Sequence, residues 1–145
     1  MSLFSPILPV DDARVGAAIA AAEQRTSGEI RVFLSSRTVE EPVKAAEQEF
    51  ERMNMTRTAA RNGVLIFVAP ASHAFAVIGD KGVHEKCGEA FWRELADAMS
   101  ARFKAGDFTA GLVLAIERAG DLLAQHFPRK PDDRNELPDS IESGH

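Results

Sequence analysis

The sequence predicts an α/β domain, a three-layer α/β/α sandwich with a small mixed β-sheet flanked by helices on both faces. The predicted elements come in the order helix–strand–helix–strand–strand–helix–helix. Residues 64–69 form a continuous apolar run, which is typical of a central strand covered on both sides. Residues 29–35 alternate between two faces, as a strand does. The first two strands are expected to run parallel, with the third antiparallel beside the second.

The amino-terminal half supplies a helix, a strand and a second helix. The first helix is predicted over residues 11–25, with Asp11 or Asp12 accepting its first free amides. Pro42 opens the second helix, because a proline in the first turn loses no hydrogen bond. The buried stripe of that helix consists of residues three to four apart: Val43, Ala46, Phe50 and Met53.

The carboxyl-terminal half supplies two strands and two helices. A short turn at 70–73 separates the apolar run from a strand at 75–78. A helix is predicted over 83–103, and Asp107 is expected to cap a last helix that ends near residue 127. Ligand sites in such sheets favour the loops that follow parallel strands. The loops at 35–40 and 70–73 lie in such places.

Three segments are distinguished along the chain. Residues 1–10 form an amino-terminal extension, residues 11–127 form the domain, and residues 128–145 form an acidic tail. The tail has only two large apolar residues, Leu137 and Ile141, so it is expected to be disordered.

The composition excludes several classes of protein. The 145 residues carry a formal charge of −5, which argues against a dedicated nucleic-acid binder. One cysteine, Cys87, excludes a scaffold built on internal disulfides. No apolar window is long enough to insert into a membrane, and no targeting signal is recognised. The expected location is therefore the cytoplasm.

Three short segments in this order resemble the TPM domain family. They are 26–30 (Thr-Ser-Gly-Glu-Ile), 62–65 (Asn-Gly-Val-Leu) and 79–83 (Gly-Asp-Lys-Gly-Val). The resemblance implies an α/β/α sandwich. Some relatives are described as acid phosphatases of the thylakoid lumen, others bind divalent cations such as calcium, and many bacterial members are membrane-anchored. Arg61 departs from the family pattern, since many relatives have an acidic residue there.

Glu29, Asn62 and Asp80 are the candidate metal ligands. Glu29 begins one strand, Asn62 precedes the next, and Asp80 follows the third, so all three are expected at one edge of the sheet. Their oxygen atoms suit a hard cation, Ca²⁺ or Mg²⁺. The alternative is structural, with Asn62 and Gly63 forming a turn and Glu29 acting as a surface or cap residue.

The loop that leads into the third helix is also a candidate anion site. Arg61, Lys81 and Gly82 are its predicted residues, because free amides at a helix start and nearby cations attract phosphate. The alternative is a tight turn from strand to helix, which needs glycine in any case.

No catalytic residue is assigned. Cys87 and Arg93 match the C-x5-R spacing of cysteine phosphatases, but the residues between them continue a helical pattern. We therefore expect an accessory or binding module, with a divalent cation at the sheet edge and a protein as its partner, including one at a membrane. The alternative is a metal-dependent phosphomonoester hydrolase of the acid-phosphatase type.

Overall fold

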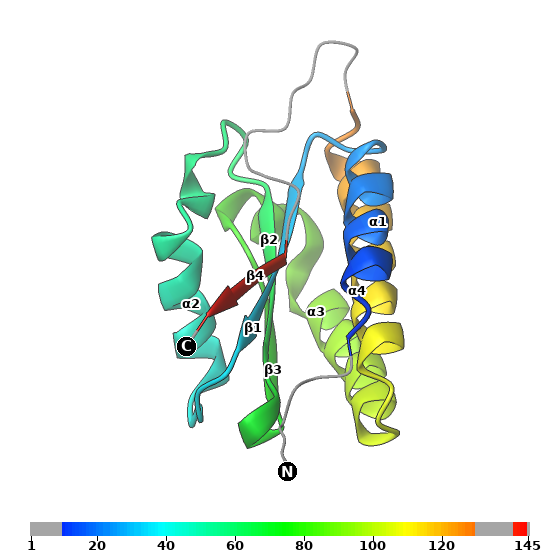
Figure 1. Ribbon diagram of the computed structural model, residues 1–145. Coiled ribbons are helices and arrows are strands. Elements are labelled where there is room, and N and C mark those ends of the chain that lie inside the picture. Colours follow the sequence, from blue (N-terminus) through cyan, green and yellow to red (C-terminus); the bar gives the residue numbers. More distant parts are fainter. Residues whose placement is uncertain (1–9, 130–140, 145) are drawn as a thin grey trace.

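The protein is a sheet between two helical layers, as seen in a computed structural model that describes residues 10–129 and 141–144. Helix α2 (Pro42–Arg52) covers one face of the sheet. The other face is covered by α1 (Asp12–Glu23), α3 (Lys81–Lys104) and α4 (Phe108–His126) (Figure 1). The predicted α/β/α sandwich is confirmed.

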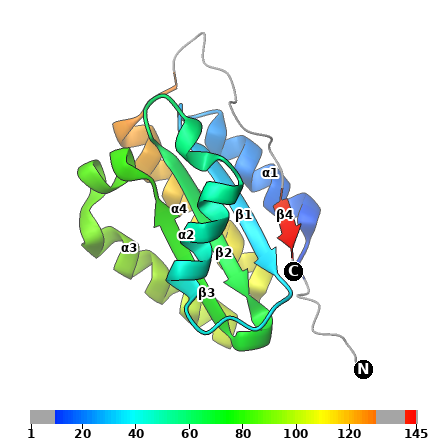
Figure 2. The ribbon, with the colours of Figure 1, turned by 90° about the vertical axis from the view of Figure 1, so that its left-hand side faces the viewer.

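The sheet has four strands in the order β3-β2-β1-β4. They are β1 (Glu29–Ser35), β2 (Gly63–Ala69), β3 (Ala74–Gly79) and β4 (Ile141–Gly144). As predicted, β1 and β2 are parallel and β3 is antiparallel to β2. Figure 2 shows these three strands behind α2.

Alternation along the strands divides the interior into two cores. Ile30 and Val32 of β1 face α1 and α4, whereas Phe33 faces α2. Strand β2 is buried along its whole length, so its side chains fill both cores. Ile66 belongs to the first and Phe67 to the second. This explains why residues 64–69 are uniformly apolar. Strand β1 is also buried on both faces, and its polar residues Glu29 and Arg31 are at most 2% exposed.

The helix caps agree with the sequence. The side chain of Asp11 accepts a hydrogen bond from the backbone of Arg14 at the start of α1. Asp107 does the same for Ala110 at the start of α4. Pro42 occupies the first turn of α2. Two short 3₁₀ helices, Met55–Arg57 and Pro70–Ser72, lie on either side of β2.

Helix α3 differs in detail from the helix predicted over 83–103. It begins two residues earlier, since Asp80 caps it, and it is broken at Gly88, where φ is 73°. Only glycine adopts this φ readily, so the break separates a short first segment from the longer remainder.

The expected disorder of residues 128–145 needs correction at residues 141–144. These residues form β4, which pairs in parallel with the second half of β1. The composition of the tail did not reveal this pairing, because a strand at a sheet edge is held by backbone groups that every sequence carries. The rest of the predicted tail after residue 129, and residues 1–9 of the predicted extension, lie outside the described residues.

Candidate functional site

The three predicted metal ligands lie at one end of the sheet, where β1 and β2 begin and β3 ends. Glu29 is paired in register with Gly63, the residue after Asn62. The backbone N–H of Asp80 donates to the carbonyl of Gly63 over 2.9 Å. Glu29, Asn62 and Asp80 are each at most 6% exposed. The topology therefore gathers them at the amino end of the sheet.

Asp80 is engaged by the chain itself. Its two carboxylate oxygens accept hydrogen bonds from Nε and Nη2 of Arg61, over 2.8 and 2.9 Å. One of them also accepts the backbone N–H of Lys81 over 2.7 Å, which caps α3. The hydrogen bond to Asp80 and the negative charge of Asp80 raise the pKa of Arg61. Arg61 thus stands where a cation would contact this carboxylate.

Glu29 belongs to a buried ionic cluster that the sequence did not predict. Nη2 of Arg31 contacts Glu29 over 3.2 Å, and Nη1 of Arg31 contacts Glu23 over 2.7 Å. Glu23 also accepts the backbone N–H of Ile30 over 2.7 Å. All three ionic side chains are at most 2% exposed. The only sequence signal was a glutamate on the buried side of α1 and an arginine inside a strand.

Asn62 links two loops at this end. Its backbone N–H donates to Oγ1 of Thr58, and its Nδ2 donates to Oγ of Ser27 over 3.3 Å. Its Oδ1 is buried, and among the described residues no donor reaches it. A buried amide oxygen without a donor is unusual in a native protein and is open to a water or a cation.

The amides at the start of α3 are also used within the chain. Gly82 N–H donates to the carbonyl of Arg61 over 2.9 Å, and Val83 N–H donates to the carbonyl of Asp80. A Cβ at Gly82 would lie 2.4 Å from the carbonyl oxygen of Ala60, so this approach requires glycine. The anion site at Arg61, Lys81 and Gly82 stays a prediction, in a place where these amides already have acceptors.

Acidic and soft metal ligands do not gather elsewhere in the described ranges. Within residues 10–129 and 141–144, no three His, Cys, Asp or Glu side chains are placed to hold a metal ion. The cation site at Glu29, Asn62 and Asp80 therefore remains a prediction that would rest on one amide and two carboxylates.

Cys87 and Arg93 lie on α3 and do not frame a phosphate-binding loop. Burial raises the pKa of the Cys87 thiol, which is the direction opposite to an activated nucleophile. The residues after Gly88 are helical as expected, but the break at Gly88 separates them from Cys87, so the match does not lie on one continuous helix.

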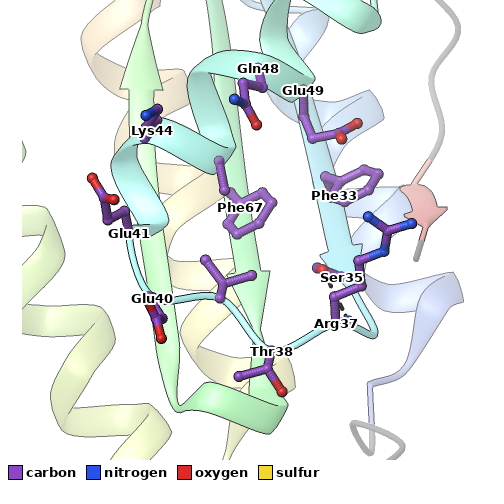
Figure 3. A pocket seen from close by; sticks show the side chains of 12 residues that line it. Phe33, Ser35, Arg37, Thr38, Glu40, Glu41, Lys44, Gln48, Glu49 and Phe67 are labelled. Atoms are coloured by element: carbon purple, nitrogen blue, oxygen red, sulfur yellow. Dashed lines mark hydrogen bonds between the residues drawn. The ribbon is translucent and has the colours of Figure 1, made fainter.

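A pocket of about 580 Å³ lies at the opposite end of the sheet, beyond the carboxyl end of β1. Its floor includes Phe33 and Phe67, whose rings stack with centroids 5.6 Å apart (Figure 3). Its walls are the loop after β1 and the first turns of α2. This is one of the places where the sequence predicted a ligand site, in the loop at 35–40.

Two serines hold the loop that forms the pocket wall. Oγ of Ser35 accepts the N–H of Arg37 over 3.2 Å, and Oγ of Ser72 accepts the N–H of Val39 over 2.6 Å. Ser72 belongs to the turn between β2 and β3, so the two loops at this end of the sheet brace each other. The pocket wall is therefore tied to the sheet.

The pocket carries exposed charges of both signs. Arg37 lies on one side of the phenylalanine floor, and Glu40 and Glu41 lie on the other, with Lys44 on the first turn of α2 (Figure 3). Among the ion pairs of the described residues, none uses any of these four side chains. The sequence pointed to this loop by its position but did not select these side chains.

Comparison with known proteins decides the family. The TPM domain matches residues 5–122, which is more than half of the chain. The chain belongs to the TPM domain family. The fold described above is therefore that of a TPM domain. Its helices, within the described residues, all fall short of the length and apolarity that crossing a bilayer requires.

Two solved structures are similar to this TPM domain. The BA42 protein from the psychrophilic bacterium Bizionia argentinensis is 41% identical, with a TM-score of 0.85 and 92% of each chain covered. The N-terminal domain of a protein from P. gingivalis is 13% identical, with a TM-score of 0.54 over 88% of this chain and 96% of that one. The second likeness concerns the fold alone. Among curated proteins, none matches this chain.

Proposed function

We propose that this TPM domain is a binding module and that its ligand site is the pocket at the carboxyl end of β1. One contrast carries the proposal. At the amino end of the sheet, Asp80 and Glu29 are paired with arginines of the same chain. At the carboxyl end, the pocket is lined by charged side chains that form no ion pair in the described part of the chain: Arg37, Glu40, Glu41 and Lys44. Charged side chains that line a pocket without an ion pair favour a ligand that carries charged groups.

The pocket favours a ligand with both signs of charge. Two cationic and two anionic side chains line it without an ion pair, over a floor of aromatic carbon. A short peptide segment of a protein partner, with acidic and basic side chains, meets these demands. Exposed charges of this kind add specificity and association rate more than affinity, so we expect weak, selective binding.

Amide NMR titration with three short synthetic peptides tests this proposal. One peptide contains alternating glutamate and lysine, one only glutamate and one only lysine. We expect the alternating peptide to cause saturable shifts in residues 35–41 and in the first turns of α2. Absence of shifts at millimolar peptide, or equal shifts from all three peptides, would overturn the proposal.

Arg37→Glu is the informative variant, and Arg93→Glu is its control. Both arginines are exposed, but Arg93 lies on α3 and does not line the pocket. We expect Arg37→Glu to weaken the alternating peptide about fivefold, as the loss of one exposed ion pair would. An equal loss in Arg93→Glu would show that net charge alone drives the binding.

A divalent cation at the amino end of the sheet is the second candidate. The buried Oδ1 of Asn62, without a donor among the described residues, favours it. Arg61→Ala would release Oδ2 of Asp80 and leave Oδ1 with the backbone N–H of Lys81, and it should therefore tighten Ca²⁺ or Mg²⁺ binding. Arg25→Ala removes another exposed arginine from a surface ion pair and serves as the control. No amide shift at millimolar cation, in the wild type or in Arg61→Ala, would exclude this site.

Phosphomonoester hydrolysis is the enzymatic alternative and derives from the family resemblance. In it, a cation held near Asp80 would polarise the phosphoryl group, and Arg61 or Lys81 would balance its charge. Turnover of p-nitrophenyl phosphate with Mg²⁺ that disappears in Asp80→Ala, with the circular dichroism spectrum retained, would support this alternative. Unchanged turnover in Asp80→Ala would mean a contaminant or a different site. The cytoplasmic location is a further proposal, which fractionation of cells expressing the full chain would test.

A further inference from the structure

Strand β3 forms one edge of the sheet, since the strand order places it outside β2 with no strand beyond it among the described residues. The hydrogen bond from Asp80 N–H to the carbonyl of Gly63 fixes the alternation of the β2–β3 ladder. Every second residue of an antiparallel strand turns its N–H and C=O away from its neighbour. On β3 these residues are Phe75, Val77 and Gly79.

Two of these three residues leave their backbone groups open. Gly79 is buried, and a Cβ there would lie 2.8 Å from Trp92 and 2.9 Å from Val83 on α3. Phe75 and Val77 are only partly buried. In the described part of the chain, no loop, cap or side chain hydrogen-bonds to the backbone of either residue. The open edge thus consists of two N–H and two C=O groups.

Within the residues that the structure describes, this edge has none of the usual protection against pairing with another strand. Sheet edges are normally protected by lysine, proline, a bulge or a covering segment. The sequence of β3, Ala-Phe-Ala-Val-Ile-Gly, contains no charge and no proline. Its pairing with β2 runs through six consecutive residues without a bulge. On the other side of the sheet, β4 covers the outer edge of β1.

We propose that β3 pairs with β3 of a second copy of this chain, so that two four-stranded sheets become continuous across a two-fold axis. An antiparallel arrangement centred on Ala76 places Phe75 opposite Val77 of the partner subunit, and Val77 opposite Phe75 of the partner subunit. Each chain then donates two N–H groups and accepts two, which leaves no group of the open edge unpaired. The edge is self-complementary, as a two-fold interface requires.

A second copy fits this edge better than a charged partner. Strand β3 has no charged side chain by which it could select another protein. A second copy of β3, running antiparallel, presents the same pattern of N–H and C=O groups and therefore matches the first. The ladder is short, so the dimer belongs to the class of interfaces below about 1,200 Å² that are weak and transient. We therefore expect a dissociation constant between about 10 μM and about 1 mM.

Sedimentation equilibrium of the full chain between about 10 μM and about 1 mM measures the association directly. Val77→Pro removes an N–H that points away from β2, so it leaves the β2–β3 ladder intact. Val77→Ala also loses the valine methyl groups but keeps the backbone N–H, and it is therefore the matched control. We expect Val77→Pro to weaken the dimer at least about tenfold relative to Val77→Ala, through the loss of two hydrogen bonds across the axis.

Amide hydrogen exchange of the wild type gives a second readout that needs no variant. The amides of Phe75 and Val77 should become protected as concentration rises, while amides on exposed helix faces stay unchanged. If Val77→Pro does not fold, this measurement alone decides. A monomer up to 1 mM, equal association of the two variants, or protection that is absent from Phe75 and Val77 would each overturn the proposal. None of these outcomes bears on peptide binding at the pocket.

Discussion

Removing Arg31 should be among the most damaging single substitutions in this domain. Its guanidinium contacts Glu23 and Glu29, and the three side chains are at most 2% exposed. In Arg31→Ala these carboxylates lose their shared cation in a place that water does not reach. Breaking a buried ion pair in this way costs about 3–5 kcal/mol of unfolding free energy. The pair between Arg25 and Asp121, 45% and 67% exposed, should contribute at most about 1 kcal/mol.

Urea denaturation followed by circular dichroism compares Arg31→Ala with Arg25→Ala. For a domain of this size, a loss of about 4 kcal/mol lowers the urea midpoint by about 2 M. A triple variant, Arg31→Met with Glu23→Gln and Glu29→Gln, should recover a large part of the loss, because no charge is then left without its partner. If Arg31→Ala falls within about 1 kcal/mol of Arg25→Ala, the cluster does not depend on Arg31 and the reasoning is refuted.

Three further substitutions and one chemical modification follow from local geometry and burial. Gly82→Ala should lose about 1–3 kcal/mol in urea denaturation, because its Cβ would collide with the carbonyl of Ala60. Gly16→Ala, in open space on α1, should gain about 0.5–1 kcal/mol, and equal effects of the two would contradict the geometry. Asp80→Ala removes the cap of α3 and should cost about 0.5–2 kcal/mol, whereas a neutral result would mean that the cap is dispensable. Burial raises the pKa of Cys87, so iodoacetamide at pH 8 should modify it more slowly in the folded protein than in urea, and equal rates would contradict this.

Local sequence signals predicted the secondary elements well, because their causes lie within a few residues. Asp11 and Asp107 are followed by helical apolar patterns, and both cap helices. The uniform apolarity of β2 reports a strand that is covered on both faces. The alternation in β1 does not report an exposed face, because β1 is buried on both faces as well. These patterns also determined that Glu29, Asn62 and Asp80 would meet at one end of the sheet.

The ion pairs at this end of the sheet were not predictable from the sequence. Arg61 was expected to be a cation near an anion site, but it holds both oxygens of Asp80. Arg31 lies in the predicted strand 29–35, and in the structure it joins Glu23 and Glu29, six residues apart in sequence, in one buried cluster. Such pairings depend on side-chain directions that are fixed only when α1 packs against β1.

The sequence by itself determined the four helices, the first three strands, their order and the two faces of the sheet, since hydrophobic period and capping are local properties. Only the tertiary structure decided which charged side chains form ion pairs within the described part of the chain and which do not. It neutralised the carboxylates at the amino end with arginines, left Arg37 and Lys44 available around a pocket, and placed β4 beside β1. Among the described residues, it also left the outer backbone groups of Phe75 and Val77 on β3 unpaired, a property that depends on strand order and that side chains do not encode.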